Sequence, residues 1–300
     1  MKPIIRYSPE FKRRLLNAIL KKRKGRMRGR TWSVKEDLHY QLSGQIEHYL
    51  EKLSYIMRWI VDKRKISLVL DAGTGFGGPF IAFFHLMSKH LGGKFLSILL
   101  DIDVDAVRIA RERIKEHRLT SETCFLVADI RYLPLRRNVM DVCLSIAVLE
   151  HLAHRGNVIA AIREMFRVLK PGGLLYIQTE NRLWPLDTHD TRLPFIRWLP
   201  DKIASFIARK LGLVDDTYMP VINGKIYLNH LPTYGEILIA LDHGFRYLPR
   251  YRSASEVLVV ERSLIRKIYF LVLLLLTKLL GHYVNWFTAE LCLLLEKQGR

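Results

Sequence analysis

The sequence predicts an α/β protein in which a mostly parallel sheet is covered by helices on both faces. Three observations support this prediction. Short apolar runs alternate with segments of helical periodicity from residue 66 onward. A glycine-rich loop, residues 73–78, joins the first apolar run to the first of these helical segments. The chain has 300 residues, of which 49% are hydrophobic, so it can bury the core that such a sheet needs.

The first part of the chain is basic and then helical. Residues 12–30 contain ten Lys or Arg and no acid, and the whole chain has a formal net charge of +19. We therefore predict a basic N-terminal arm over residues 1–33, suited to the phosphates of nucleic acid or of anionic lipid. A solvated tail without a specific partner is the alternative. Apolar residues at helical spacing then predict one long helix or two short ones over residues 34–65.

The predicted strands and helices of the sheet follow in order. Seven strands are expected from short apolar runs, over residues 66–70, 94–100, 123–128, 140–148, 174–179, 255–260 and 289–297. Helices are expected over residues 80–91, 104–117, 158–169 and 233–245. The third of these should stop before Pro171, which cannot continue a helix. We expect one domain over residues 34–300.

Two segments depart from this alternation. Residues 180–229 hold several prolines and aromatics, which predicts an insertion that serves as a lid or substrate wall, or else as a structural cover. Residues 264–282 are apolar and predict either a surface helix that dips into a membrane or a helix buried in the protein or a dimer interface. The longest apolar run contains Lys278 and is shorter than the roughly 20 residues that span a bilayer.

The cysteines indicate the redox environment. Cys124, Cys143 and Cys292 each lie within an apolar run, which predicts small buried side chains and no disulfide or metal framework. No secretory signal is visible at the N-terminus. We therefore expect a cytoplasmic protein, or one that is peripheral on the inner face of a membrane.

The glycine loop predicts a nucleotide-like ligand. A loop of this kind between a strand and a helix exposes main-chain N–H groups at the carboxyl edge of a parallel sheet. With Gly73, Gly75 and Gly78 the loop can be a dinucleotide fingerprint, in which a pyrophosphate lies on the helix N-terminus. The spacing Asp71-x-Gly73-x-Gly75-x-Gly77 instead resembles the first motif of class I S-adenosylmethionine-dependent methyltransferases.

Further motifs favour the methyltransferase interpretation. Asp101 ends the second strand and Asp129 the third, the fourth strand is followed by "LEH", and "LKPGG" precedes the fifth. This ordered series over residues 66–179 resembles the ubiquinone/menaquinone-biosynthesis type of these enzymes. The resemblance implies a Rossmann-like, seven-stranded, mostly parallel sheet and S-adenosylmethionine as cofactor. It implies that the cofactor is bound by Asp71, Gly73, Gly75, Gly77, Asp101, Ile102, Asp129, Ile130 and Ser145.

The resemblance also directs attention to two possible bases. Methyl transfer from a sulfonium is an in-line displacement, so the protein mainly aligns the reactants and excludes water. A hydroxyl acceptor is helped by a general base, for which His151 and His189 are the candidates. Each can equally be a structural or a solvated histidine. Some quinone O-methyltransferases bind a metal through a glutamate where this chain has Ala147, so no metal is expected.

The class of methyl acceptor is restricted mainly by motifs that the sequence lacks. The fourth strand is followed by neither the Asn/Asp-Pro-Pro-aromatic motif of adenine amino methyltransferases nor the Pro-Cys nucleophile used on cytosine. We expect a small-molecule or lipid-like acceptor such as a quinone, a lipid or a lipid-linked sugar, and contact with an anionic membrane surface. An RNA methyltransferase that uses the basic arm, and a noncatalytic module that binds S-adenosylmethionine, are the alternatives.

Overall fold

The structure is a computed structural model. It describes residues 7–23, 34–61, 66–91, 95–119, 123–187, 190–213, 221–222, 225–226, 228–242, 244–250, 258, 263–282, 285 and 288–299. His189 and residues 24–33 of the predicted basic arm therefore lie outside the described residues.

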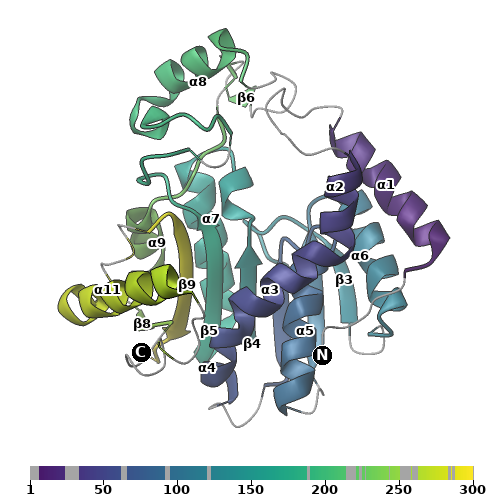
Figure 1. Ribbon diagram of the computed structural model, residues 1–300. Coiled ribbons are helices and arrows are strands. Elements are labelled where there is room, and N and C mark those ends of the chain that lie inside the picture. Colours follow the sequence, from purple (N-terminus) through teal and green to yellow (C-terminus); the bar gives the residue numbers. More distant parts are fainter. Residues whose placement is uncertain are drawn as a thin grey trace.

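The fold is built on a seven-stranded sheet with the strand order β3-β2-β1-β4-β5-β9-β8 (Figure 1). The strands are β1 (Leu68–Ala72), β2 (Leu96–Asp101), β3 (Thr123–Val127), β4 (Met140–Ile146), β5 (Leu169–Glu180), β8 (Phe245–Leu248) and β9 (Glu290–Lys297). Strands β1 to β5 pair in parallel, and β9 is antiparallel to both of its neighbours. The predicted Rossmann-like, mostly parallel sheet is confirmed.

One predicted strand differs from the strand that completes the sheet. The seventh strand is β8, which pairs with β9 at the edge, whereas residues 255–257 and 259–260 lie outside the described residues. Arg246 and Tyr247 interrupt the apolar character of β8, and the strand has only four residues. Its short, mixed pattern is weaker than the apolar run at 255–260, so apolar patterning did not identify β8 as a strand.

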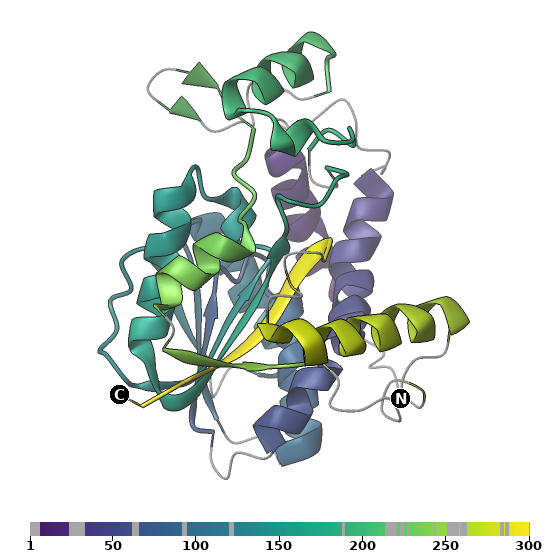
Figure 2. The ribbon, with the colours of Figure 1, turned by 90° about the vertical axis from the view of Figure 1, so that its left-hand side faces the viewer.

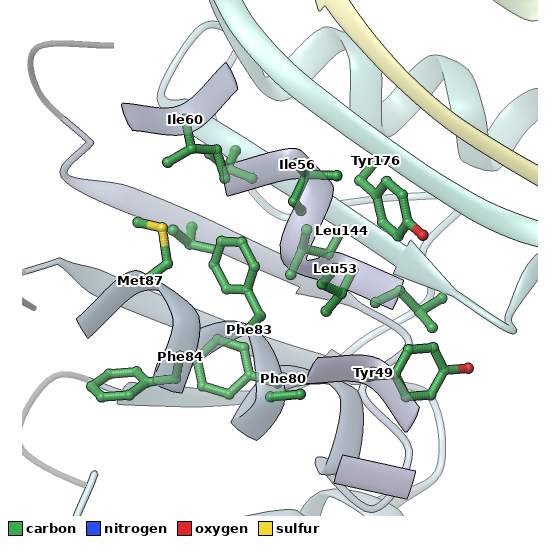
Figure 3. Close-up of a cluster of buried hydrophobic side chains, with 14 of the residues drawn as sticks. Tyr49, Leu53, Ile56, Ile60, Phe80, Phe83, Phe84, Met87, Leu144 and Tyr176 are labelled. Atoms are coloured by element: carbon green, nitrogen blue, oxygen red, sulfur yellow. The ribbon is translucent and has the colours of Figure 1, made fainter. Parts of the chain in front are cut away.

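Helices cover both faces of the sheet, as predicted. One face is covered by α3 (Gln45–Leu53), α4 (Met57–Val61) and α5 (Gly78–Leu91), and the other by α7 (Arg155–Val168) and α9 (Tyr234–Leu241) (Figure 2). Figure 3 shows how Leu53, Ile56, Phe80, Phe83 and Tyr176 pack in the first of these layers. Successive strand residues enter opposite layers, because a strand points alternate side chains to opposite faces.

The start of the chain is a helix docked on the domain. Helix α1 (Pro9–Arg23) packs on α6 (Val104–Glu116), where α1 buries Phe11, Leu15 and Ile19 against Ile109. Acidic side chains of α6 pair with basic side chains of α1, namely Glu112 with Arg14 and Asp105 with Lys21. Residues 9–23 of the basic arm therefore form a packed helix.

Residues 34–61 are continuously helical. A π-helical turn, Tyr40–Gly44, joins α2 (Val34–His39) to α3, and a 3₁₀ turn, Ser54–Ile56, joins α3 to α4. Such π-helical turns interrupt the regular helix ladder and often occur at functional sites.

The insertion after β5 folds outside the sheet, at the top of the molecule in Figure 1. It contains a 3₁₀ turn (Ile196–Trp198), α8 (Asp201–Lys210) and a two-stranded sheet of β6 (Val221–Ile222) and β7 (Lys225–Ile226). Buried Arg197 holds it together, pairing with Asp187 at 3.1 Å and with Asp190 at 2.5 Å and donating to the carbonyl of Asn229. These carboxylates flank His189 in the sequence and serve the packing of the insertion.

The cysteines differ in their burial. Cys143 is buried in β4, but Cys124 is exposed on the edge strand β3, so the expectation that all three cysteines are buried is wrong. Strand β3 has a neighbour on only one side, and its second residue points away from the core.

Helix α11 (Leu264–Leu280) forms in the apolar segment. Over the described ranges, no helix is long and apolar enough to cross a membrane.

Candidate functional site

The loop between β1 and α5 has the geometry of a ligand cradle. Gly73, Gly75 and Gly77 have φ angles of +91°, +52° and +77°, a region that side chains strongly disfavour. The amides of Gly73 and Thr74 both donate to the carbonyl of Leu100 at 2.8 Å, which ties the loop to the end of β2. The loop is thus held at the carboxyl edge of the sheet.

Two of these glycines are needed for different reasons. A Cβ at Gly73 would lie 2.4 Å from Cγ2 of Val148, so this position admits no side chain. A Cβ at Gly75 would meet nothing within 4 Å. The side of Gly75 that a side chain would occupy therefore faces open space, which leaves room for a ligand to lie on the loop.

Asp71 is the penultimate residue of β1, directly before this loop. Its side chain is buried, and its Oδ2 has no hydrogen-bond partner among the residues that the structure describes. Burial, with a smaller contribution from the charge of Asp101, raises the pKa of Asp71 to about 7. A buried carboxylate with a free oxygen is suited to a cationic ligand group, because the cation would offset the cost of burying the charge.

Asp101 ends the next strand and reaches the same loop. Its Oδ2 accepts a hydrogen bond of 2.8 Å from the amide of Gly75, and its Oδ1 accepts one of 3.0 Å from the amide of Asp103. Ile102, the following residue, exposes its apolar side chain to solvent. A carboxylate next to an exposed apolar side chain matches a nucleoside, which offers ribose hydroxyls and a flat apolar ring.

The third strand contributes a carboxylate that already has a partner. Asp129 accepts hydrogen bonds from Nε and Nη2 of Arg131 at 2.9 Å and 2.6 Å, and these bonds lower the pKa of Asp129. Arg131 also donates to Asn157 at 3.0 Å. Ile130 packs its side chain into the core, so it offers a ligand only its main chain.

The fourth strand places Ser145 and the "LEH" turn. Ser145 is buried in β4, and its Oγ also has no partner within the described part of the chain. Glu150 turns inward and accepts a 2.8 Å hydrogen bond from Thr179 Oγ1. His151, which follows it in a 3₁₀ turn, is exposed at the carboxyl edge. Of the two predicted bases, His151 is thus seen at this edge.

Sequence reasoning missed a buried cation behind the glycine loop. Arg113 of α6 is fully buried and donates to the carbonyl of Phe76 in the loop at 3.2 Å and to Tyr7 Oη at 3.0 Å. It also donates to the carbonyls of Gln41 and Leu42 in the π-helical turn. In the sequence Arg113 is one of several basic residues of an amphipathic helix, and nothing marks it as buried.

The arrangement fits S-adenosylmethionine. The cofactor has two cationic centres, a ribose and an adenine, which match the free oxygen of Asp71, the carboxylate of Asp101 and the side chain of Ile102. No cluster of three or more His, Cys, Asp or Glu side chains able to hold a metal occurs among the described residues.

Comparisons with known proteins find methyltransferases. Residues 70–177 match the family described as methyltransferase domain. An uncharacterised protein of Methanocaldococcus jannaschii is 32% identical over 136 residues, covering 45% of this chain and 50% of that protein. A tRNA (carboxymethyluridine(34)-5-O)-methyltransferase of Arabidopsis thaliana is 34% identical over 136 residues, covering 45% and 28%. A ubiquinone/menaquinone biosynthesis C-methyltransferase of Pseudomonas putida is 36% identical over 110 residues, covering 36% and 40%.

These matches concern the central part of the chain. The chain spans half of the first relative and less than half of the other two. The matched residues contain the glycine loop and the acids that end β1, β2 and β3. The chain therefore contains a methyltransferase domain over residues 70–177.

Proposed function

We propose that this protein transfers a methyl group from S-adenosylmethionine to a lipid-like or small-molecule acceptor, such as a quinone, a lipid or a lipid-linked sugar. The observation that carries the acceptor class is an exposed apolar wall that begins directly after β5. We call this set the acceptor wall: Leu183, Trp184, Leu186, Phe195 and Trp198.

The acceptor wall lies at the edge of the sheet that carries the site. Strands β1 and β5 run in the same direction, so the glycine loop and the acceptor wall both follow carboxyl ends (Figure 1). Within the wall, the rings of Phe195 and Trp198 pack edge to face with centroids 4.8 Å apart, and Trp198 Nε1 donates to the carbonyl of Leu183. An ordered set of exposed apolar side chains is typical of a surface that binds an apolar partner.

The residues of the site have distinct roles in this proposal. The cofactor supplies an electrophilic methyl group. Asp71 and Asp101 bind and orient it, and the glycine loop lets its atoms approach the main chain. His151, exposed at the same edge, accepts the proton of a hydroxyl acceptor.

RNA is the second candidate acceptor, favoured by the relative that methylates tRNA and by the net charge of +19. RNA binding would use free cations to neutralise phosphates. In the described part of the basic arm, however, Arg14 and Lys21 are paired with acids of α6. This pairing reduces the charge available for phosphates and places RNA second.

A transfer assay with methyl-labelled S-adenosylmethionine tests the proposal. Total lipid extract and total RNA from the same cells are offered separately, and the Asp101→Ala variant serves as the blank. Label in the lipid fraction supports the proposal. Label in RNA alone would replace the acceptor class, and label in neither extract, with cofactor binding intact, would favour a noncatalytic module or a soluble acceptor.

The acceptor wall is tested by a matched pair of variants. Trp198→Ala should raise KM for the lipid-like acceptor about tenfold and leave cofactor affinity unchanged, because only apolar acceptor contacts are lost. Leu96→Ala is the control, since Leu96 is as exposed but begins β2 at the opposite edge of the sheet. Equal KM values for the two variants would remove the wall from the acceptor site.

A further inference from the structure

We propose that α11 lies in the headgroup layer of an anionic membrane and holds the protein to that surface. The proposal concerns where the protein binds and not which molecule it methylates. Binding to a membrane is measured without methyl transfer, so it can fail while the proposed function stands, and the reverse also holds.

The free face of α11 is a continuous apolar stripe. The stripe consists of Ile265, Ile268, Val272, Leu275 and Leu279, whose exposed fractions lie between 51% and 80%. Their spacing of three and four residues places them on one side of the helix. The opposite side carries Phe270 and Leu274, which are buried. Exposed apolar side chains in such a row mark an interaction surface.

The charges of α11 indicate what covers the stripe. The helix contains Arg266, Lys267 and Lys278 and no acidic residue. Arg266 pairs with Glu51, so Lys267 and Lys278 are the cations of this helix that would meet lipid phosphates. An apolar face with lysines beside it complements an anionic bilayer, whose acyl chains contact the apolar side chains and whose phosphates contact the lysines. A second copy of the chain would instead bring two cationic helices together, and the like charges would oppose that pairing.

The helix is also held in a position that suits a membrane surface. Arg266 pairs with Glu51 of α3 at 2.8 Å, and the guanidinium of Arg250 lies 4.6 Å from the ring centroid of Phe270. These contacts hold the buried side of α11 to the domain. In Figure 2 the helix crosses the front of the molecule with its length along the surface. Its 17 residues are about 25 Å long, enough to lie in the plane of the headgroups.

Flotation with lipid vesicles tests the proposal. The full chain is mixed with vesicles of phosphatidylcholine containing about 30% phosphatidylglycerol, and with pure phosphatidylcholine vesicles as the neutral comparison. We expect it to float with the anionic vesicles and far less with the neutral ones. The Ile268→Ser/Leu275→Ser variant should partition at least about tenfold more weakly, because two apolar side chains no longer enter the acyl region.

Two matched variants separate the apolar and the electrostatic contributions. Leu96→Ser/Val127→Ser removes two equally exposed apolar side chains from the sheet and should float like the unchanged protein. Lys267→Gln/Lys278→Gln should weaken binding to the anionic vesicles and leave the weak binding to neutral vesicles unaltered.

Two outcomes would contradict the proposed membrane binding. Equal flotation of the unchanged protein and the stripe variant, both folded by circular dichroism, would overturn the proposal. So would a dimer, measured by light scattering, that the stripe variant dissociates while the unchanged protein ignores vesicles. If the double variant fails to fold, Ile265→Ser replaces it, because Ile265 is 80% exposed and contributes little to the core.

Discussion

The carboxyl group of Asp71 is buried, and its pKa is raised to about 7 mainly by that burial. A cationic ligand group would favour the carboxylate, so binding should release a proton below that pH. Affinity for S-adenosylmethionine should therefore rise about tenfold from pH 6 to pH 8, since ionisation of one group with a pKa near 7 limits binding. Calorimetry over this range measures the effect. Asp71→Asn should give a flat profile, and a flat profile for the unchanged protein would contradict the assigned role.

Asp101 offers a second test at the level of one residue. Asp101→Ala should weaken cofactor binding by more than tenfold, because charge-assisted hydrogen bonds to the ribose and the bond to the Gly75 amide are lost. Asp103→Ala is the matched control: Asp103 caps α6 by accepting from the amide of Asp105, and its loss costs about 1 kcal/mol of stability. Calorimetric titration distinguishes the two. Unchanged affinity in Asp101→Ala would remove Asp101 from the site.

His151 is the residue whose test depends on the acceptor. If a hydroxyl is methylated, His151→Gln should lower kcat about 100-fold with unchanged cofactor affinity, because the general base is lost while the glycine loop is intact. The measurement is steady-state kinetics with the labelled acceptor fraction. A kcat within about twofold of the unchanged enzyme would show that the proton leaves by another route.

The sequence predicted where the acids of the site lie, but not which side chains pair with them. Asp71, Asp101 and Asp129 were expected at one edge of the sheet and lie there, because a parallel sheet brings the carboxyl ends of its strands together. The ion pair between Asp129 and Arg131 was not predicted from the sequence, because it depends on side-chain conformations that periodicity does not describe.

At the level of elements, Arg113 joins α6 to the glycine loop, the π-helical turn and Tyr7. Arg113→Met should cost about 3 kcal/mol in the free energy of unfolding, because the partly buried carbonyls of Phe76, Gln41 and Leu42 lose a charged donor. It should also weaken cofactor binding, since the carbonyl of Phe76 is no longer held. Urea denaturation and calorimetry measure the two effects.

Tyr7→Phe is the conservative comparison for Arg113. It removes the hydroxyl that accepts from Arg113 and that also hydrogen-bonds to His117 Nε2 at 2.9 Å, and it should cost about 1 kcal/mol. Because Tyr7 does not touch the loop carbonyl, cofactor affinity should change little. Equal losses of stability for Arg113→Met and Tyr7→Phe would mean that Arg113 contributes through Tyr7 alone.

Apolar periodicity in the sequence was sufficient to predict four of the helices. Helices α5, α6, α7 and α9 follow from apolar periodicity, because each buries one face on the sheet. The docking of α1 did not follow. Its sequence is dominated by Lys and Arg, and the apolar residues Phe11, Leu15 and Ile19 acquire meaning only once α6 provides a matching face.

At the scale of the whole molecule, the reactivity of the three thiols measures how often the sheet opens. Cys124 is exposed at the edge, whereas Cys143 is buried in β4 and burial raises its pKa. A thiol reagent should modify Cys124 rapidly in the native protein, and Cys143 only at the rate at which the sheet unfolds. Burial raises the pKa of Cys292 to about 12, so it should react slowly as well.

Mass spectrometry of the labelled protein checks this order of reaction. The same experiment in urea, where all three thiols are accessible, gives the reference rates. Rapid native labelling of Cys143 would show that strands β4 and β5 separate without global unfolding, contrary to their place in the middle of the sheet.

The sequence by itself determined the order of the elements and the chemistry of the cofactor edge. Both follow from local causes: apolar periodicity selects strands and helices, and positive φ angles require Gly73, Gly75 and Gly77. Only the tertiary structure decided that β8 completes the sheet, that α1 is packed on α6, and that the stripe of α11 is left uncovered. The physical reason is that pairing and burial depend on which surfaces meet in space, and segments far apart in the chain supply those surfaces.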